Sequence, residues 1–480
     1  MELNTELLDA IKQAVVTVFP AYKQQGEPLK QEHPNITASR FLLENQIIAA
    51  KAGIYRFNSK WWHEVSDSEM LARLIHYDQE SGGPSSNRRR NEELSYIKAV
   101  KYEPVVHWNN IAEWEVPFEN GVLNLITGKM RQHEAKDYLE NVIPHEYDAI
   151  GVSPLWERCL TDYFDSDEDG KQKIAALQEF FGYVLLPHAR YKKALMLYSH
   201  TGDTGKSTIK EMLEYLVGAF GACHIGLDTM GDRFALAPIV GKRLNSVSEQ
   251  SVNVRIADGK FKELVGTQEP VQIERKGKDP FEYTPIAKHV ICTNNLPRID
   301  DTTNAVYNRL LVIELTRVVT KKDTQIWNKL KAEFSGIVAW AVEGAKRLRT
   351  AGGEFTKVDS SETLIARYKS SQSPIGQFLA EHCVKKPEGD RLTPKWRIPT
   401  SEALDRYREY ERNDRITSQN FTAGLRPIGV QVEEMGVCYD GRRTRYIAGY
   451  RWKTPEEVKR EAEQAGRAEV DQPELPGVRQ

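Results

Sequence analysis

Residues Lys192–Gly218 read KKALMLYSHTGDTGKSTIKEMLEYLVG, and this stretch decides the fold. The apolar run Ala194–Tyr198 is typical of a buried strand, and a polar loop with two glycines follows it. Beyond the loop, apolar residues from Ile209 to Leu216 recur at the spacing of one helix face. A strand, a glycine-containing loop and a helix in this order predict an α/β core with a phosphate-binding loop. The alternative is a chance Gly-Lys-Ser tripeptide, which the strand before it and the helix after it disfavour.

The loop carries the residue types that phosphate binding needs. Glycines let backbone N–H groups turn inward around phosphate oxygens, and the N-terminus of the next helix adds its positive end. Lys206 would reach the β- and γ-phosphates of a nucleotide, and the Ser207 hydroxyl would ligate Mg²⁺. The usual pattern GxxxxGK[ST] has a glycine where His200 stands, and Gly202 is expected to relieve part of that constraint. The predicted nucleotide-binding residues are Gly202, Asp203, Thr204, Gly205, Lys206, Ser207 and Thr208.

Three polar residues next to apolar strands extend the candidate site. The segment Ile239–Gln250 delivers Glu249 to the end of a short strand, where a Walker B acid must stand to polarise water and help hold Mg²⁺. An acid at the end of an ordinary strand is an equally good interpretation of this residue alone. The strand within Ile286–Asn295 ends in Asn294, an amide that can hold the attacking water against the γ-phosphate. Arg309 begins the next strand, where an arginine is usually a solvated strand edge but in ring ATPases reaches the neighbour's nucleotide.

The succession of these motifs resembles the superfamily 3 helicases. SHTGDTGKST, GKRLNSVSEQ, FKELVGTQEP, ICTNNLPRID and AVYNRLLVIEL are similar in order, spacing and strand placement to motifs A, B, B′ and C and the arginine finger. The preceding VPFENGVLNLITGKM and LQEFFGYVLL are similar to the domain before the motor in phage and plasmid primase-helicases. The resemblance covers about residues 55–453 and implies an ATP-driven, ring-forming DNA helicase, with six subunits expected. It assigns ATP and Mg²⁺ as cofactors and catalytic roles to Lys206, Glu249, Asn294 and Arg309.

A charged hairpin is predicted just beyond motif B′. Residues 270–285, PVQIERKGKDPFEYTP, indicate two short strands with Arg275, Lys276 and Lys278 clustered at the tip. In the resembled family the corresponding hairpin projects into the channel of the ring and touches the DNA backbone. Phosphate contacts of that kind confer affinity without sequence preference. The alternative is an exposed, charged turn with no ligand.

Composition indicates a folded multidomain protein. The chain has 480 residues, of which 40% are hydrophobic and 28% charged, and its formal charge of −2 requires any nucleic-acid contact to come from local positive patches. Five scattered cysteines without a CxxC pair indicate neither a disulfide framework nor a zinc site, which fits a reducing compartment. No apolar run approaches the roughly 20 residues that cross a bilayer, and the first residues do not form a signal peptide. A cytoplasmic protein without membrane contact is expected.

The predicted organisation is an α/β AAA+-type P-loop motor with an N-terminal α+β accessory domain and a C-terminal winged helix. Arg442, Arg443 and Arg445 fall in the expected wing, and such modules bind either DNA or protein. About 50 residues before the accessory domain cannot hold a primase, so a separate primase or replication initiator is a possible partner. The predicted parts are a helical segment (1–53), the accessory domain (54–152), a helical collar (153–190), the motor (191–318), a helical segment and linker (319–374), the winged helix (375–453) and a disordered tail (454–480).

Two alternatives to a helicase are open at this point. An origin-remodelling or defence ATPase would show DNA-stimulated hydrolysis without strand displacement. A DNA-binding or scaffold protein with an inactive phosphate loop is the other, because His200 departs from the usual pattern. Measurable turnover of ATP would remove that second alternative.

Overall fold

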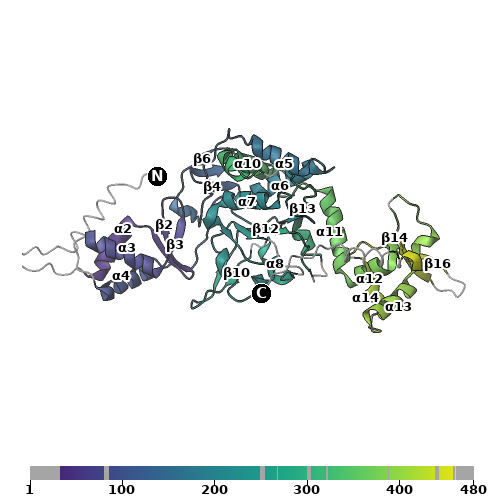
Figure 1. Ribbon diagram of the computed structural model, residues 1–480. Coiled ribbons are helices and arrows are strands. Elements are labelled where there is room, and N and C mark those ends of the chain that lie inside the picture. Colours follow the sequence, from purple (N-terminus) through teal and green to yellow (C-terminus); the bar gives the residue numbers. More distant parts are fainter. Residues whose placement is uncertain are drawn as a thin grey trace, which may run out of the picture. The chain divides into compact units, whose positions relative to one another are not determined.

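The structure, a computed structural model, divides the chain into two compact units. One unit comprises residues up to 58 together with 62–106, and the other comprises 59–61 and the residues from 107 onward. Each unit is described by itself below, with the element labels of Figure 1. The described residues are 33–80, 86–248, 254–266, 269–299, 304–320, 323–387, 389–426, 428–437, 443–457 and 460.

In its described residues, the first unit packs three helices on a three-stranded antiparallel sheet. Its core contains Phe41, Met70 and Leu94, all of which are buried. The sequence predicts helix up to residue 53, but Ile47–Ala50 forms a strand because this short apolar run pairs across a tight turn with the strand that follows it. The elements are α2 (Pro34–Glu44), β1 (Ile47–Ala50), β2 (Gly53–Phe57), β3 (Trp62–Val65), α3 (Asp67–Glu80) and α4 (Asn87–Val100).

A five-stranded parallel sheet forms the centre of the second unit. Its strand order is β13-β7-β12-β9-β8, and every strand pair in it is parallel. Strands with apolar residues on both faces are typical of such a sheet, which helices cover. The predicted α/β core is therefore confirmed. Its elements are β7 (Ala194–Tyr198), α7 (Lys206–Gly221), β8 (Ala222–Cys223), β9 (Leu244–Val247), α8 (Asp258–Leu264), β12 (Lys288–Thr293) and β13 (Leu310–Glu314).

Helices from both sides of the motor sequence pack together over this sheet. Helices α6 and α10 touch through backbone atoms, because a Cβ added to Gly182 would lie 2.1 Å from Ala345 N and one added to Gly344 would lie 2.0 Å from Gln178 O. Glycine is the residue that allows such an approach. The predicted collar and the helical segment after the motor thus form one layer (Figure 1). The helices are α5 (Pro154–Phe164), α6 (Gly170–Leu185), α9 (Ile326–Ala332) and α10 (Phe334–Thr350).

Residues 107–147 belong to the motor unit. Phe118 and Ile143 are buried in the same core as α6 and α7. The sequence predicts one accessory domain over 54–152, whereas the compact units divide after Val106. The segment contains the antiparallel strands β4 (Glu115–Phe118), β5 (Gly121–Asn124) and β6 (Met130–Arg131) and the short helix η1 (Ala135–Asp137).

The C-terminal part begins with a helix where the sequence predicts a polar linker. In α11 (Asp359–Gln372), the Ser361 hydroxyl donates to Val312 O and the Tyr368 hydroxyl to Pro297 O, so the helix is fixed to the motor. Three helices and two small antiparallel sheets then share a separate core. The winged-helix interpretation of this module stays a prediction. Its elements are α12 (Pro374–His382), β14 (Cys383–Lys385), β15 (Arg397–Pro399), α13 (Thr400–Glu411), α14 (Ser418–Leu425), β16 (Val432–Val437), β17 (Arg443–Ala448) and β18 (Tyr450–Trp452).

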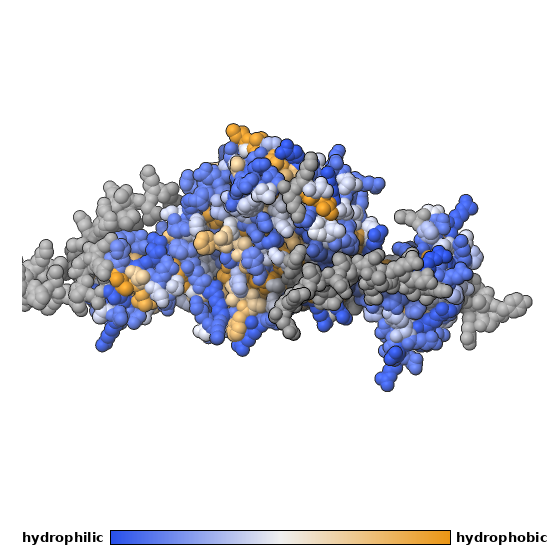
Figure 2. Space-filling model, in the orientation of Figure 1, coloured by the Kyte–Doolittle hydropathy of each residue, from blue (hydrophilic) through white to orange (hydrophobic). Residues whose placement is uncertain are grey.

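The visible surface is mostly hydrophilic, and hydrophobic side chains are grouped in small patches (Figure 2). Within the ranges that the structure describes, no helix combines the length and apolarity needed to cross a bilayer. The disordered tail predicted for 454–480 lies outside the described residues, apart from 454–457 and 460.

Candidate functional site

The loop Ser199–Gly205 lies at the carboxyl edge of the parallel sheet, between β7 and α7. Neighbouring segments hold it on both sides. Ser199 N donates to Thr293 O at the end of β12 (3.3 Å), and Val319 N donates to Asp203 O (2.8 Å). Ligands of open α/β sheets bind outside the carboxyl ends of the strands, so this is the edge where a nucleotide is expected.

Gly205 is the residue on which the loop geometry depends. Its φ of +94° lies in the left-handed region, and a Cβ at this position would come within 2.8 Å of the Tyr163 ring. Tyr163 projects from α5, and its hydroxyl is hydrogen-bonded to the Thr208 side chain. Burial raises the pKa of Tyr163 to about 12, so the phenol stays neutral. The collar helix therefore shapes the loop from outside, and no motif in the sequence indicates this role.

Substituting Gly205 with alanine is expected to lower nucleotide affinity by at least about tenfold, because the left-handed backbone costs roughly 1–2 kcal/mol and the methyl group displaces Tyr163. Equilibrium binding of a labelled nucleotide measures the loss. Gly128→Ala is the matched control, since Gly128 has a φ of +69° but no atom within 4 Å of an added Cβ. Equal binding by both variants would show that the loop does not hold the nucleotide.

His200 replaces the first glycine of the usual phosphate-loop pattern, and a residue other than Gly202 compensates for it. Gly202 does not adopt a positive φ; Asp203 does, at +58°. Aspartate tolerates this region better than most residues. His200 turns outward, with 74% of its side chain exposed, and its Nδ1 lies 2.9 Å from the Tyr198 hydroxyl oxygen. The missing first glycine therefore does not put a side chain into the turn of the loop.

A pocket of about 660 Å³ opens on the loop, within the range of small-ligand sites. Lys206 is 7% exposed, and its Nζ donates to Thr201 O (3.2 Å) across the turn. The Thr204 hydroxyl is buried and, among the described residues, has no hydrogen-bond partner. Helix α7 begins here and directs its positive end at the pocket. These residues fit a nucleotide polyphosphate, and the Ser207 hydroxyl, which also lines the pocket, fits a divalent cation beside it.

The other walls of the pocket come from segments without a recognised motif. Arg158 and Asp162 line it from α5, and Arg317 lines it from the segment after β13. The Arg317 guanidinium donates to Asp162 O (2.7 Å), which closes one side. The position of Arg317 can be inferred from the sequence. Arg317 follows a predicted strand, and parallel strands end at the same edge of the sheet as the loop.

Asn294 lies next to the loop. Thr293 pairs with Tyr198 in the parallel register of β12 and β7, so the residue after each strand stands at the same edge. Strand β9 also ends at this edge, since Val247 pairs with Ile291. Glu249 follows β9 in sequence but lies outside the described residues, and its Walker B role stays a prediction.

Arg309 lies at the opposite edge of the sheet. It precedes Leu310, which pairs with Ala194 at the start of β7. Six strand positions of about 3.3 Å separate it from the loop, roughly 20 Å in all. Its guanidinium donates to Val265 O (3.1 Å) and Ala305 O (2.8 Å). The side chain therefore cannot reach the loop of its own chain.

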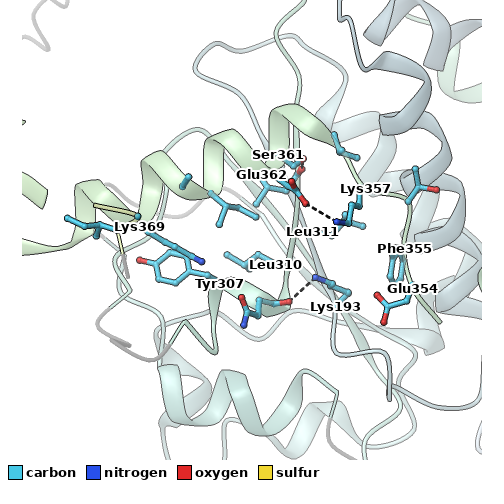
Figure 3. Close-up of a pocket in the computed structure, with 18 residues that line it drawn as sticks. Lys193, Tyr307, Leu310, Leu311, Glu354, Phe355, Lys357, Ser361, Glu362 and Lys369 are labelled. Atoms are coloured by element: carbon cyan, nitrogen blue, oxygen red, sulfur yellow. Dashed lines mark hydrogen bonds and ion pairs between the residues drawn. The ribbon is translucent and has the colours of Figure 1, made fainter. Parts of the chain in front are cut away.

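A second pocket, of about 610 Å³, lies beside β13 (Figure 3). The lysines that line it are engaged with neighbouring groups. Lys193 Nζ donates to Asn308 O (2.8 Å), Lys357 pairs with Glu362 (4.0 Å), and Lys369 lies over the Tyr307 ring (5.3 Å). None of the predicted site residues lines this pocket.

The predicted hairpin is present. Strand β10 (Val271–Ile273) pairs antiparallel with β11 (Phe281–Tyr283). At the tip, Lys276 and Lys278 are exposed. The Arg275 guanidinium lies 5.3 Å from the centre of the Phe281 ring. Two of the three predicted cations are thus directed to solvent. Their contact with nucleic acid stays a prediction.

Two family models match parts of the chain. Residues 36–165 match a family described as D5 N terminal like, a range that covers most of the described first unit and continues through the whole of α5. Residues 197–309 match a family of unknown function, DUF5906, which includes the loop, Asn294 and Arg309.

Viral proteins are related to this chain in sequence. Putative helicase 184R of Invertebrate iridescent virus 6 is 26% identical over 225 residues, which cover 41% of this chain and 22% of the relative. Putative helicase 121R of Invertebrate iridescent virus 3 is 22% identical over 313 residues, 58% of this chain and 33% of the relative. The chain thus spans between a fifth and a third of the length of these relatives.

Among solved structures, the A form of the apo NrS-1 C terminal region has a similar fold. It superposes with a TM-score of 0.50 and 12% sequence identity, over 88% of this chain and 100% of the other. That likeness shows the mixed α/β fold with its parallel sheet. The D5-type match and the two viral proteins make this chain similar in sequence to putative viral helicases.

Proposed function

We propose that the chain is the ATP-dependent motor of a superfamily 3 DNA helicase that serves the replication of a phage, plasmid or related mobile element. One observation carries the proposal. The lysine-bearing loop and Asn294 share the carboxyl edge of the sheet, while Arg309 stands at the amino edge, out of reach of its own loop. Such a division completes each site only when another subunit supplies the arginine. A closed ring, expected to contain six subunits, satisfies that requirement.

ATP binding in this proposal depends on the loop and on α7. Backbone N–H groups of Gly202–Gly205 and the positive end of α7 would hold the phosphates, and the Lys206 ammonium would lie between the β- and γ-phosphates. Ser207 and Glu249 would hold Mg²⁺. When bound, that ion would neutralise phosphate charge and orient the γ-phosphoryl group.

Hydrolysis in this proposal uses residues from two subunits. Glu249 would take a proton from the attacking water, and the Asn294 amide would orient that water in line with the γ-phosphate. Arg309 of the neighbouring subunit would stabilise the charge that develops in the transition state. Water exclusion by the second subunit would strengthen each of these electrostatic contacts.

The sequence order links the nucleotide site to the hairpin. Strand β11 leads through four residues into β12, and Asn294 directly follows the last residue of β12. The hairpin and Asn294 therefore stand at the two ends of one buried strand. A shift of β12 that accompanies hydrolysis would move the hairpin, and Lys276 and Lys278 would carry a DNA strand with it.

The C-terminal module is proposed as a winged helix that makes a second contact, with DNA or with a separate primase or initiator. Arg445 pairs with Glu434 (2.8 Å), which leaves one side of the proposed wing partly neutralised. Arg442 lies outside the described residues, and so does the side chain of Arg443. The cytoplasm is the proposed compartment.

Strand displacement on forked DNA with ATP is the experiment that tests the function. A helicase displaces the strand, and Lys206→Ala run beside it does not. An origin-remodelling or defence ATPase gives DNA-stimulated phosphate release without displacement. A scaffold protein gives neither signal, and that result would exclude the proposal.

Removing both tip lysines should separate DNA handling from nucleotide chemistry. In the double variant Lys276→Ala/Lys278→Ala, basal ATP hydrolysis should be preserved because neither residue lines the nucleotide pocket. DNA-stimulated hydrolysis and unwinding should fall strongly. Binding should weaken equally for all DNA sequences, and each lost phosphate contact should flatten the salt dependence on single strands by about 0.7 in slope.

A matched pair of lysines controls for net charge in that experiment. Lys346→Ala/Lys357→Ala removes the same charge from residues that pair with Glu343 (2.7 Å) and Glu362 (4.0 Å). This control should unwind DNA like the parent. Normal unwinding by the tip variant would remove the hairpin from the mechanism and direct attention to the C-terminal arginines.

A further inference from the structure

A buried polar cluster lies beneath the base of the hairpin. The Tyr283 hydroxyl, at the end of β11, donates to Glu140 Oε2 (2.8 Å) and accepts from Gly241 N (2.8 Å). Asn109 Nδ2 donates to the same carboxylate oxygen (3.0 Å), and Glu140 N donates back to Asn109 Oδ1 (3.3 Å). All three side chains are less than one tenth exposed. One tyrosine hydroxyl thus joins the hairpin to two segments far from it in sequence.

A second layer of buried basic side chains joins this cluster to the sheet. Arg243, immediately before β9, is fully buried and donates to Asn141 Oδ1 and to Leu185 O (3.1 Å). Lys288, the first residue of β12, donates through Nζ to Leu186 O (2.6 Å) and through its backbone N–H to Arg243 O (2.9 Å). Segment 107–147, the end of α6 and the starts of two sheet strands are therefore connected by polar contacts.

Burying these groups is costly for the fold. Burial raises the pKa of Glu140 to about 7, although Tyr283, Asn109 and Arg243 act in the opposite direction. Burial also lowers the pKa of Arg243 to about 10. Apolar residues of similar volume often stabilise a core as well as buried ionisable groups do, so such a cluster is poorly explained by stability alone. Hydrogen bonds are directional, whereas apolar contacts are not. A cluster of hydrogen bonds can therefore fix the orientation of the hairpin.

Outside this cluster, the described contacts of the hairpin include an exposed ion pair between Glu274 and Arg233 (2.8 Å) and buried apolar side chains. Each of its strands is three residues long, and the two pair only with each other in the described sheet arrangement. An isolated two-stranded hairpin is marginally stable in water. The buried side chains of Val271 and Ile273 also anchor the hairpin, but apolar contacts are less directional than hydrogen bonds.

We propose that Tyr283 and Glu140 are positioning residues whose hydrogen bond ties the base of the hairpin to segment 107–147, so that movement of β12 is transmitted to the hairpin tip. This inference rests on the proposed helicase function. It assigns segment 107–147 a part in force transmission, beyond its contribution to the core. The tip lysines bind the DNA, whereas the Tyr283–Glu140 bond makes their displacement follow the nucleotide site.

Hydrogen–deuterium exchange tests the tether without any activity. Tyr283→Phe keeps the ring and removes the hydroxyl, and the amides of residues 271–283 should then exchange at least about tenfold faster, the effect of one lost buried hydrogen bond. Tyr183→Phe is the control, because its buried hydroxyl accepts from Tyr191 N (3.1 Å) away from the hairpin. Unchanged hairpin exchange in Tyr283→Phe would overturn the tether.

Kinetics then test its role. Tyr283→Phe should bind single-stranded DNA and hydrolyse ATP without DNA within about twofold of the parent, but should lose about tenfold in DNA-stimulated hydrolysis and in base pairs opened per ATP. Glu140→Gln should behave like the parent, because an amide oxygen still accepts both hydrogen bonds. If Tyr283→Phe does not fold, as judged by its melting temperature, Glu140→Ala removes the acceptor instead and the same losses are expected.

Failure of this inference is distinguishable from failure of the proposed function. A parent protein that neither hydrolyses ATP nor unwinds DNA contradicts the proposed function, whatever the exchange data show. A parent that unwinds, with Tyr283→Phe unwinding equally well, contradicts the inference alone. A Tyr283→Phe variant that loses DNA affinity as fully as the tip-lysine variant also contradicts the inference. The Tyr283–Glu140 bond would then only maintain the structure of the hairpin.

Discussion

Replacing Lys206 with alanine is expected to lower ATP hydrolysis on the order of 100-fold or more, because the loop loses the cation aimed at the β- and γ-phosphates. The geometry supports a large effect. The Lys206 ammonium lies 3.2 Å from Thr201 O, across the turn of the loop, and the residue is almost fully buried. In such surroundings a charge-assisted contact with phosphate is screened little by water. Steady-state phosphate release, with and without DNA, measures the loss.

A lysine one turn further along the same helix provides the control. Lys210 pairs with Glu214 (3.1 Å) on α7, so Lys210→Ala removes the same side chain from the same helix without touching the loop. It should hydrolyse ATP at close to the parental rate. Near-normal turnover in Lys206→Ala would instead exclude the phosphate loop.

Glu249→Gln should separate binding from chemistry. The amide preserves the shape of the side chain but removes the charge that activates water, so ATP should still bind while hydrolysis is lost. Nucleotide binding and phosphate release, measured on the same sample, distinguish the two steps. A variant that fails to bind ATP would show that Glu249 is structural or essential for Mg²⁺.

The central strand, the loop and the helix after it can be predicted because their signals are local. An apolar run before two glycines and a 3.6-residue period after them require no knowledge of the rest of the chain. The edge shared by the loop and Asn294 is also predictable, since parallel strands place their carboxyl ends together. The same holds for the hairpin, where Gly277 adopts a φ of +74° at the expected turn.

Long-range packing explains what the sequence does not reveal. Gly205 is recognisable as a loop glycine, but the Tyr163 ring that excludes a side chain there comes from another helix. Phe118 and Ile143 are typical of any small sheet core, so nothing local indicates that they pack with α6 and α7. Alternation and periodicity report which face is buried, not which element covers it.

Helix α11 is a polar segment that the sequence predicts to be a linker. Its residues are mostly hydrophilic, and only Ser361 and Tyr368 are buried. Those two side chains donate to Val312 O and Pro297 O, so two hydrogen bonds to the motor take the place of a wide apolar face. A helix held in this way carries a weak periodic signal.

Arg309→Ala should lower hydrolysis by about 10³-fold or more if the arginine acts as a finger, since removal of that charge affects only the transition state. ATP affinity of the isolated subunit should change little, because Arg309 lies roughly 20 Å from its own loop. Phosphate release and nucleotide binding, measured on the same preparation, separate the two quantities. Arg309→Lys keeps the charge without the planar fork and should remain defective.

Mixing two inactive variants tests whether the arginine crosses the subunit boundary. A site between an Arg309→Ala subunit, which keeps Lys206, and a Lys206→Ala subunit, which keeps Arg309, contains one intact copy of each residue. In random equimolar rings about a quarter of the interfaces have this arrangement, so hydrolysis should recover toward that fraction of the parental rate. Assemblies shown to be mixed but without activity would contradict action in trans. The contacts with Val265 O and Ala305 O would then explain Arg309 as a structural residue of its own subunit.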